Sequence, residues 1–460
     1  MAEVVCISPI DGAVVARRAT ATPAAMGAAI TSARAAQRAW ARVSIAERGA
    51  VVLRALAALD AMNGEVVPEL ARQMGRPVRF GGEFRSVKER VEHMVAIAES
   101  ALAPVVPAAK EGFTRRIERV PLGLVLVVAP WNYPFLTAVN TIVPGLMAGN
   151  AVILKAASQT ILTGERFQQA FDAAGLPNGL FQNLVLSHDD TARLIAGRHV
   201  DHVSFTGSVE GGRAIERAAA ATFTSVGLEL GGKDPAFIRA DAKLDHAIEN
   251  VVDGAFFNSG QSCCGIERVY AHADVYDRFV EGAVAAAKAY VLDDPLTEAT
   301  TLGPMAATRF ADVVRGHTAD ALAKGARATI DAKAFKRNAA GTPWLAPQVL
   351  IDVDHTMQVM VEETFGPVVG IMKVRDDGEA VRLMNDSPYG LTASIWTADL
   401  DAAARLGAEI ETGTVFANRC DYLDPALAWT GVKATGRGAT LSPLGYHALT
   451  RPKSLHLRAV

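Results

Sequence analysis

Short apolar runs and helical periodicities alternate through the middle of the chain. Strand-like runs lie at 124–128, 151–154, 181–185 and 203–205. A helical stretch from Thr160 to Ala174 separates two of them and ends at Gly175. This alternation predicts a parallel sheet built of β-α-β units. Such sheets bind ligands where their strands end, which directs attention to residues 130–134, 155–158 and 206–208.

The first hundred residues carry helical patterns instead. Thr22-Pro23 is a typical helix start, because Thr caps and Pro suits the first helical position. Ser44 and Glu47 have the spacing of a capping box. The stretch from 83 to 102 is amphipathic, and its Arg, Lys and Glu residues are expected to form a solvated helix face.

A second region of strands and helices follows, from about Gly231 to Ala428. Its expected strands are 269–271, 349–351, 368–372 and 414–417, and its expected helices are 275–292 and 401–410. The segment 113–120 alternates as an exposed ribbon, since its basic side chains leave it no core. The tail from His447 to Val460 is also partly alternating.

Composition narrows the class of protein. The chain has 460 residues, with 46 Lys plus Arg against 49 Asp plus Glu, and a net charge of −3. This balance gives no basic footprint for nucleic acid. Four Cys fit a reducing compartment. No apolar run approaches the roughly 20 residues that span a bilayer, and the N-terminus lacks a basic leader. A cytoplasmic protein with no membrane or nucleic-acid partner is expected.

Three residues are candidates for chemistry. Cys263 follows Gly and Gln residues that favour a tight turn, so it is either a thiolate nucleophile or a buried, inert Cys. Glu229, flanked by Leu and followed by two Gly, is either a general base with a raised pKa or a surface acid. Asn132 lies between two prolines and is either an oxyanion donor or a turn residue.

Two weaker signals concern ligands. Phe205-Thr206-Gly207-Ser208 precedes Gly211-Gly212 and a helix, so backbone N–H groups there are suited to a phosphate. It does not match the G-x-G-x-x-G pattern. His199 and His202 have no Cys, Asp or Glu partners at ligand spacing, and no metal site is predicted.

Seven motifs in order resemble the aldehyde dehydrogenase superfamily over nearly the whole chain. They are PWNYP at 130–134, GNAVILK at 149–155, FTGS at 205–208, ELGGK at 229–233, FNSGQSC at 257–263, EETFGP at 362–367 and NDSPYGL at 385–391.

The resemblance implies roles for the three candidates. Cys263 attacks the aldehyde carbonyl, and the oxyanion is held by the Asn132 side chain and the Cys263 backbone N–H. Hydride passes to a nicotinamide, which leaves a thioester, and Glu229 activates the water that hydrolyses it. The donors must be preorganised for the oxyanion, and the base needs a pKa near neutrality.

The resemblance also implies a nicotinamide cofactor. Its expected contacts are Trp131, Lys155, Ser158, Gly207, Ser208, Leu230, Glu363 and Phe365. Many NAD-preferring members have Glu where this chain has Ser158, and that carboxylate would repel a 2′-phosphate. NADP, as well as NAD, is therefore expected to be accepted.

Other departures from the family pattern concern the substrate. The expected tunnel walls are Tyr133, Thr137, Asn140, Ser262, Cys264 and Leu423. Asn140-Thr141 replaces an aromatic residue and Lys. The segment from Ala428 to Thr440 is altered, and Thr440 stands where some members have a second proton-relay Glu. Arg419 near the tunnel mouth either meets an anionic substrate or faces solvent.

The implied fold is α/β, with a Rossmann-like cofactor domain, an α/β catalytic domain and a small β-ribbon. Residues 1–110 and 122–229 are assigned to the NAD(P)-binding domain, 230–430 to the catalytic domain, and 111–121 with 447–460 to an oligomerisation ribbon of a homodimer or homotetramer. The leading function is NAD(P)-dependent oxidation of an aldehyde, a small-molecule substrate, to a carboxylic acid. Alternatives are acyl transfer to coenzyme A or phosphate, a catalytically silent binding protein, and a thiol esterase.

Overall fold

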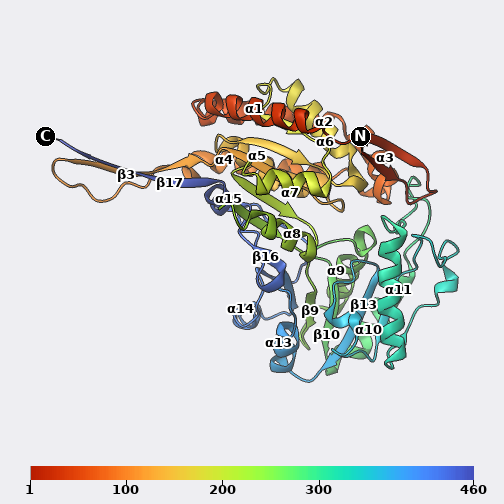
Figure 1. Ribbon diagram of the computed structural model, residues 1–460. Coiled ribbons are helices and arrows are strands. Elements are labelled where there is room, and N and C mark those ends of the chain that lie inside the picture. Colours follow the sequence, from red (N-terminus) through yellow and green to blue (C-terminus); the bar gives the residue numbers. More distant parts are fainter. Residues whose placement is uncertain (1, 460) are drawn as a thin grey trace.

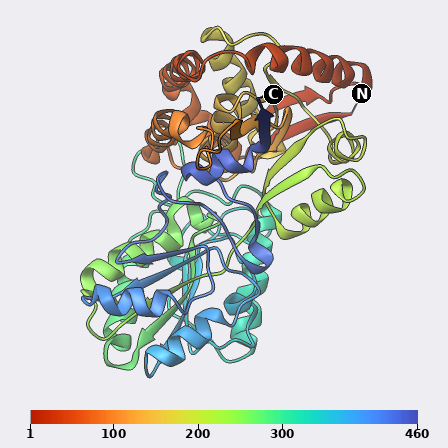
Figure 2. The same cartoon turned by 90° about the vertical axis from the view of Figure 1, so that its left-hand side faces the viewer.

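The computed structural model describes residues 2–459, which form two lobes around separate β-sheets (Figure 1, Figure 2). The first sheet has six strands in the order β16-β8-β7-β4-β5-β6. The second has seven, in the order β11-β12-β13-β10-β9-β14-β15. Neighbouring strands are parallel except β16 against β8 and β11 against β12. The predicted α/β class is confirmed.

The strands span these residues: β1 Glu3–Ile7, β2 Val14–Ala19, β3 Phe113–Pro121, β4 Leu124–Val128, β5 Ala151–Lys155, β6 Phe181–Asn183, β7 His202–Thr206, β8 Ser225–Glu229, β9 Asp234–Ile238, β10 Ile266–His272, β11 Arg327–Ala328, β12 Gln348–Ile351, β13 Val368–Val374, β14 Thr392–Trp396, β15 Thr414–Ala417, β16 Gly436–Arg437 and β17 Thr450–Arg458.

The helices span these residues: α1 Pro23–Trp40, α2 Ile45–Ala61, α3 Asn63–Met74, α4 Phe84–Ala101, α5 Pro134–Met147, α6 Leu162–Ala173, α7 His188–Ala196, α8 Val209–Ala219, α9 Leu244–Phe256, α10 Ala273–Lys288, α11 Thr308–Ala323, α12 Gln358–Val361, α13 Asp377–Asn385, α14 Leu400–Gly407 and α15 Ser442–Ala448. Short 3-10 turns lie at Val78–Phe80, Ser158–Thr160, Phe257–Gly260, Ala332–Ala334 and Lys433–Thr435.

Most elements of the first lobe form as their patterns predict. The Thr22 side chain caps α1, and Ser44 with Glu47 forms the capping box of α2. Strands β4 and β5 are buried along their whole length, which explains their unbroken apolar runs. The expectation of helices alone in the first hundred residues is wrong, because β1 and β2 form an antiparallel hairpin. Most of that hairpin's residues are at least partly exposed, so no apolar run marks it.

The second lobe contains two core strands that no apolar run predicts. The predicted strands at β10, β12, β13 and β15 are confirmed, whereas β9 and β14 lie between them and were missed. β9 and β14 carry Asp, Pro, Thr and Ser among their buried residues, so their runs are short. In the first lobe β8 was missed for a similar reason, since only Leu228 of its five residues is buried.

The chain crosses between the lobes more than once. After the second sheet, β16 returns to the first sheet and pairs with the end of β8, where Gly436 faces Glu229. Helix α15 then packs on α4 and α5. The segment after residue 430 therefore closes over the first lobe.

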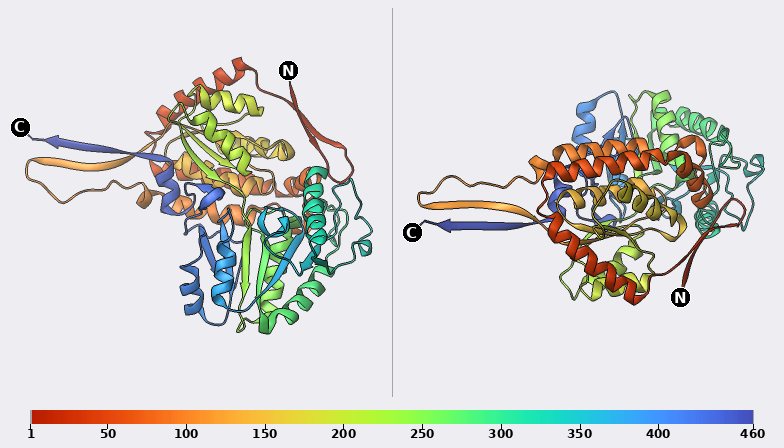
Figure 3. Two further views of the ribbon diagram at one scale, coloured as in Figure 1. Left: turned by 60° about the horizontal axis from the view of Figure 1, so that its bottom comes forward. Right: turned by 90° about the horizontal axis from the view of Figure 1, so that it is seen from above.

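A two-stranded ribbon extends from the body of the molecule (Figure 1, Figure 3). β17 pairs antiparallel with β3, from Thr450 opposite Pro121 to Arg458 opposite Phe113. The expected pairing of the tail with this ribbon is confirmed, and its role in joining subunits stays a prediction. Within residues 2–459, no helix combines the length and the apolar character needed to cross a membrane.

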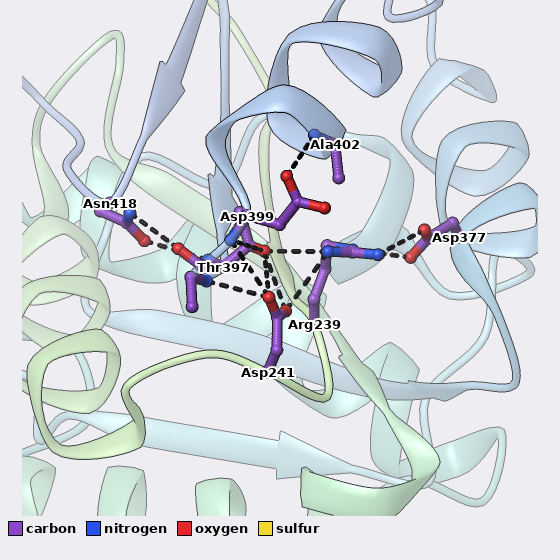
Figure 4. A network of polar contacts seen from close by, with 8 residues as sticks. Arg239, Asp241, Asp377, Thr397, Asp399, Ala402 and Asn418 are labelled. Atoms are coloured by element: carbon purple, nitrogen blue, oxygen red, sulfur yellow. Dashed lines mark hydrogen bonds and ion pairs between the residues drawn. The ribbon is translucent and has the colours of Figure 1, made fainter.

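A polar network ties together the ends of three strands in the second lobe (Figure 4). Asp241 accepts hydrogen bonds from the Thr397 hydroxyl and from the backbone N–H of Ala398, at 2.7 and 3.0 Å. The Asn418 side chain bonds both backbone polar groups of Thr397. Arg239 makes two 2.9 Å bonds to Asp377. This network fixes the start of the loop from 418 to 424.

Candidate active site

A cavity of about 580 Å³ lies where β4, β5, β7 and β8 end. Asn132, Glu229 and Cys263 all line it, together with Trp131, Lys155, Gly207, Ser208, Leu230, Glu363 and Phe365. All three candidates for chemistry and seven of the eight expected cofactor residues thus border one space. The loops after three predicted strands supply the residues at 130–132, 155 and 206–208, as the parallel-sheet argument requires.

The turn that carries Cys263 has an unusual backbone. Asn258 and Ser259 have φ values of 53° and 59°, in the left-handed region, and Gly260 follows with 70°. The Ser259 hydroxyl donates to the Gly303 carbonyl at 2.9 Å, and the Gln261 side chain accepts from the Ala306 N–H at 2.8 Å. These contacts hold a strained turn in one conformation and leave the Cys263 side chain partly exposed to the cavity.

Asn132 is held by backbone and side-chain contacts from several segments. Its amide donates to the Gln261 carbonyl at 3.2 Å, two residues before Cys263. Its carbonyl accepts from Arg76 and from the Asn258 amide. Asn132 is 4% exposed. The side chain is therefore positioned beside the nucleophile turn before any substrate arrives.

Behind Asn132 lies a buried ion pair. Arg76 and Glu83 are 2.6 Å apart, with both side chains only 3% exposed. Glu83 also accepts from the N–H groups of Phe135 and Leu136, at the start of α5. Burial raises the pKa of Glu83, while Arg76 and these N–H groups oppose the shift. The pair ties α5 to the segment before α4.

Glu229 ends β8 and is held by two hydroxyls. Thr440 donates to Oε1 at 2.5 Å, and Thr206 donates to Oε2 at 3.1 Å. Burial raises the pKa of Glu229, and the two hydroxyls and Arg90 oppose that shift. A carboxyl in this setting has the raised pKa that a general base needs. Thr440 stands where some family members have a proton-relay Glu, and its hydroxyl contacts Glu229.

Two glycines bring three functional groups together. A Cβ atom on Gly231 would lie 2.2 Å from a carboxylate oxygen of Glu363. A Cβ atom on Gly232 would lie 2.8 Å from the Cys263 carbonyl oxygen. The Gly232 N–H donates to Glu363 at 3.0 Å. The Glu-Leu-Gly-Gly motif therefore allows Glu229, the Glu363 carboxylate and the Cys263 backbone to pack closely.

The remaining cavity walls suit a dinucleotide. Ser208 caps α8, a helix of 11 residues, by accepting from the Gly211 N–H at 3.2 Å. Lys155 is buried at the end of β5, and burial lowers its pKa. Trp131 stacks on Phe310 and meets Phe365 edge-on. Burial and the neighbouring Glu267 raise the pKa of Glu363 to about 8.

Ser158 and the expected tunnel residues lie elsewhere. Ser158 is exposed at a 3-10 turn and does not line this cavity. The tunnel residues Tyr133, Thr137, Asn140, Ser262, Cys264 and Leu423 do not line it either. Cys264 and Leu423 pack with Cys263, Trp429 and Leu441. Arg419 is exposed and lies over the Tyr422 ring.

The expected solvated face of α4 needs a correction. Lys88 and Glu92 are more than half exposed, as expected. Arg90 is only 4% exposed, and the Glu83 side chain just before the helix is also buried. The hydrophobic pattern of this helix does not distinguish buried from exposed charged residues. Arg and Glu occur at the same helical spacing whether they face solvent or pack against another element.

Sequence reasoning also missed several residues at the site. Thr206 and Thr440 on Glu229, and Phe310 on Trp131, carry no motif of their own. Asp421 accepts from Ser262 and Cys264, at 3.2 and 2.9 Å. The alignment of Thr440 with a relay acid was the one signal that pointed to such a contact. Across the described chain, no group of three or more His, Cys, Asp or Glu is arranged to hold a metal ion.

Fold and site together define an α/β oxidoreductase class with a cysteine at a dinucleotide-sized cavity. A family model described as the aldehyde dehydrogenase family matches residues 2–455. The chain belongs to the aldehyde dehydrogenase family.

Relatives with different substrates are about equally similar to this chain. A 3,6-anhydro-alpha-L-galactose dehydrogenase of Streptomyces coelicolor is 33% identical over 459 residues, covering 98% of this chain and 92% of the relative. An NADP-dependent succinate-semialdehyde dehydrogenase of Deinococcus radiodurans is 33% identical, covering 97% and 93%. The structure of NADP-dependent glyceraldehyde-3-phosphate dehydrogenase from Bacillus halodurans, complexed with NADP, gives a TM-score of 0.93 at 29% identity, covering 100% and 96%.

Proposed function

We propose that this enzyme oxidises an aldehyde to a carboxylic acid through a covalent intermediate on Cys263, with NAD or NADP as hydride acceptor. The observation that carries the proposal is that Cys263, Glu229 and Asn132 line one cavity with Lys155, the α8 terminus and Glu363. Nucleophile, base and oxyanion donor thus border the space that suits the cofactor.

The first half-reaction forms and oxidises the covalent adduct. The Cys263 thiolate adds to the carbonyl carbon, and the carbonyl electron pair moves to oxygen. The Asn132 amide and the Cys263 backbone N–H donate to this oxyanion. When the C=O bond forms again, hydride leaves the carbon for the nicotinamide ring, and a thioester remains on Cys263.

The second half-reaction releases the acid. Glu229 takes a proton from water, whose oxygen attacks the thioester carbon. The C–S bond breaks, and the thiolate of Cys263 is restored. Because Thr206 and Thr440 hold both carboxylate oxygens, Glu229 is oriented before the water arrives.

The cavity residues fit a nicotinamide dinucleotide. When bound, this cofactor accepts the hydride and carries it away. Lys155 and Glu363 line the cavity, which supports the expectation that they bond the ribose hydroxyls, and the N–H groups at the start of α8 suit the pyrophosphate. Gly231 leaves room for the Glu363 carboxylate at this wall. Acceptance of NADP, expected from Ser158, remains part of the proposal.

Acyl transfer to coenzyme A and a silent binding role are the weaker candidates. Transfer to a thiol needs no water-activating base, yet Glu229 lies in the cavity with Cys263 and is held by two hydroxyls. A silent protein has no use for a nucleophile, a base and an oxyanion donor in one space.

Replacement of Cys263 tests the proposal. Cys263→Ala should lower NAD(P)H formation from aldehydes by at least about 10³-fold, as removal of a covalent nucleophile does, with cofactor affinity retained. Cys6→Ala is the matched control, because Cys6 lies in the remote β1 strand, and it should keep full activity. Equal activity of Cys263→Ala and the wild type would refute the covalent mechanism.

A further inference from the structure

Arg90 is a buried cation without a partner acid. It lies on α4 and is 4% exposed. Its Nη1 donates to the Leu136 carbonyl at 2.8 Å and to Asn140 Oδ1 at 3.0 Å. Among the residues described, no carboxylate oxygen lies within 4.0 Å of the Arg90 guanidinium nitrogens. The Arg90 Nε and Nη2 atoms donate no hydrogen bond to any described residue. A buried charge of this kind is costly unless an anion compensates it.

Three segments place Arg90 near the nucleophile turn. The adjacent residue Glu89 accepts a hydrogen bond from the Tyr422 hydroxyl, which ties α4 to the loop from 418 to 424. In the same loop, Asp421 accepts from Ser262 and Cys264 on either side of Cys263. Helix α4, helix α5 and this loop thus converge beside the reacting sulfur.

The place where α4, α5 and this loop meet lies outside the cofactor cavity. Neither Arg90 nor Asn140 lines that cavity, and Cys264 does not line it either. The Glu229 carboxylate nevertheless acts on Arg90 and opposes the lowering of the Arg90 pKa by burial. Arg90 therefore lies within electrostatic reach of Glu229, although it does not line the cofactor cavity.

The side-chain amide of Asn140 is a second donor without an acceptor, next to the guanidinium group of Arg90. The Asn140 Nδ2 atom is buried without a hydrogen-bond partner, while its Oδ1 is bonded to Arg90. Asn140 is 1% exposed. Two donor groups thus lack acceptors at one place, and a carboxylate has two oxygens to offer. Asp421 is the nearby acid; burial raises its pKa, while its hydrogen bonds from Cys264 and Ser262 and the charge of Arg90 oppose that shift.

We propose that Arg90, assisted by the Asn140 amide, binds an anionic group on the far end of the aldehyde, so the substrate is a carboxylated aldehyde. This assignment rests on the proposed function. The carboxylate of the substrate supplies the missing counter-charge, and the aldehyde end reaches Cys263.

Two aldehydes that differ only in charge test the assignment. Succinic semialdehyde carries a terminal carboxylate, and butanal has the same chain length without it. The expected wild-type result is a kcat/KM at least about tenfold higher for the semialdehyde, since a hydrogen bond to a charged group is worth roughly 1.5–3 kcal/mol. Arg90→Gln should lose about 10- to 100-fold with the semialdehyde, mostly in KM, and much less with butanal, whose oxidation Arg90 affects only through the pKa of Glu229.

Controls separate recognition from folding and from catalysis. Arg90→Lys keeps the charge and should retain part of the preference. Arg85→Gln removes an exposed Arg of the same helix and should change neither substrate. Butanal turnover by Arg90→Gln reports that the variant is folded and that the Cys263 chemistry is intact.

Each other outcome has a distinct meaning. Equal losses with both aldehydes would overturn the assignment and make Arg90 an electrostatic support for Glu229 and Cys263. Butanal oxidation by the wild type with no preference for the semialdehyde would also overturn it, while leaving the proposed function standing. No NAD(P)H from either aldehyde would overturn the proposed function and this assignment together.

Discussion

The two sides of Cys263 are built in different ways. On the cofactor side, a cavity is walled by turns that follow buried strands. On the other side, α4, α5 and the loop from 418 to 424 meet, with Arg76, Glu83 and Arg90 buried among them. The first side depends on backbone shape, and the second depends on the identity of individual side chains.

This contrast separates two tasks. Positioning a cofactor and an oxyanion needs turns, helix ends and glycines, which many aldehyde-oxidising relatives can share. Under the proposal above, selecting a substrate depends instead on individual buried charges, of which Arg90 is the example. Relatives with different substrates at about one-third identity fit this division.

The largest effect expected on the cofactor side is the loss of hydrolysis in Glu229→Gln. Without the base, the thioester should persist, so steady-state turnover should fall by about 10²- to 10⁴-fold. The first turnover should still release a stoichiometric burst of NAD(P)H. Rapid-mixing absorbance and the intact mass of the acylated enzyme measure both. If the burst disappears as well, Glu229 acts already in the first half-reaction.

Breaking the buried ion pair should chiefly reduce stability. Arg76→Met leaves the Glu83 carboxylate buried and unpaired, which should lower the free energy of unfolding by about 3–5 kcal/mol. The control is Lys88→Met, since Lys88 and Glu92 are more than half exposed and 3.8 Å apart; it should cost less than about 1 kcal/mol. Urea unfolding measures both variants. Similar losses would contradict the distinction between buried and exposed pairs.

The smallest effect should arise at Thr440, which contacts Glu229 without belonging to a shared motif. Its hydroxyl favours the ionised carboxylate and so lowers the pKa of Glu229. Thr440→Val should raise that pKa, moving the acid limb of the kcat–pH profile to higher pH. The rate at neutral pH should fall by roughly 2- to 10-fold. Thr440→Ser should keep the wild-type kcat–pH profile. If the acid limb of that profile does not shift in Thr440→Val, the Thr440 hydroxyl does not influence the pKa of Glu229.

Sequence patterns predict the strands that are buried on both faces and the helix caps that form within one turn. β4 and β5 are buried on both faces and read as apolar runs, and Ser44 with Glu47 forms a cap within one turn. The β1–β2 hairpin has no such uniform burial and escaped notice.

The residues of the candidate site also differ in how far the sequence predicts them. Cys263, Glu229 and Asn132 stand in motifs whose turns form locally, so their meeting at one cavity could be anticipated from the resemblance. Thr440 reaches Glu229, and Tyr422 reaches Glu89, across long stretches of chain. Single-chain patterns contain no signal for such long-range pairs, and the burial of Arg90 was missed for this reason.

The ribbon has a consequence for synthesis of the chain. Because β17 lies far downstream of β3 in the chain, β3 leaves the ribosome long before its partner exists, and its edge stays open until residues 450–458 are made. An open strand edge invites pairing with other chains. β3 carries Arg115, Arg116, Glu118 and Arg119 among its nine residues. These charges make the waiting strand a poor template for aggregation, so the ribbon is protected during the interval in which it is incomplete.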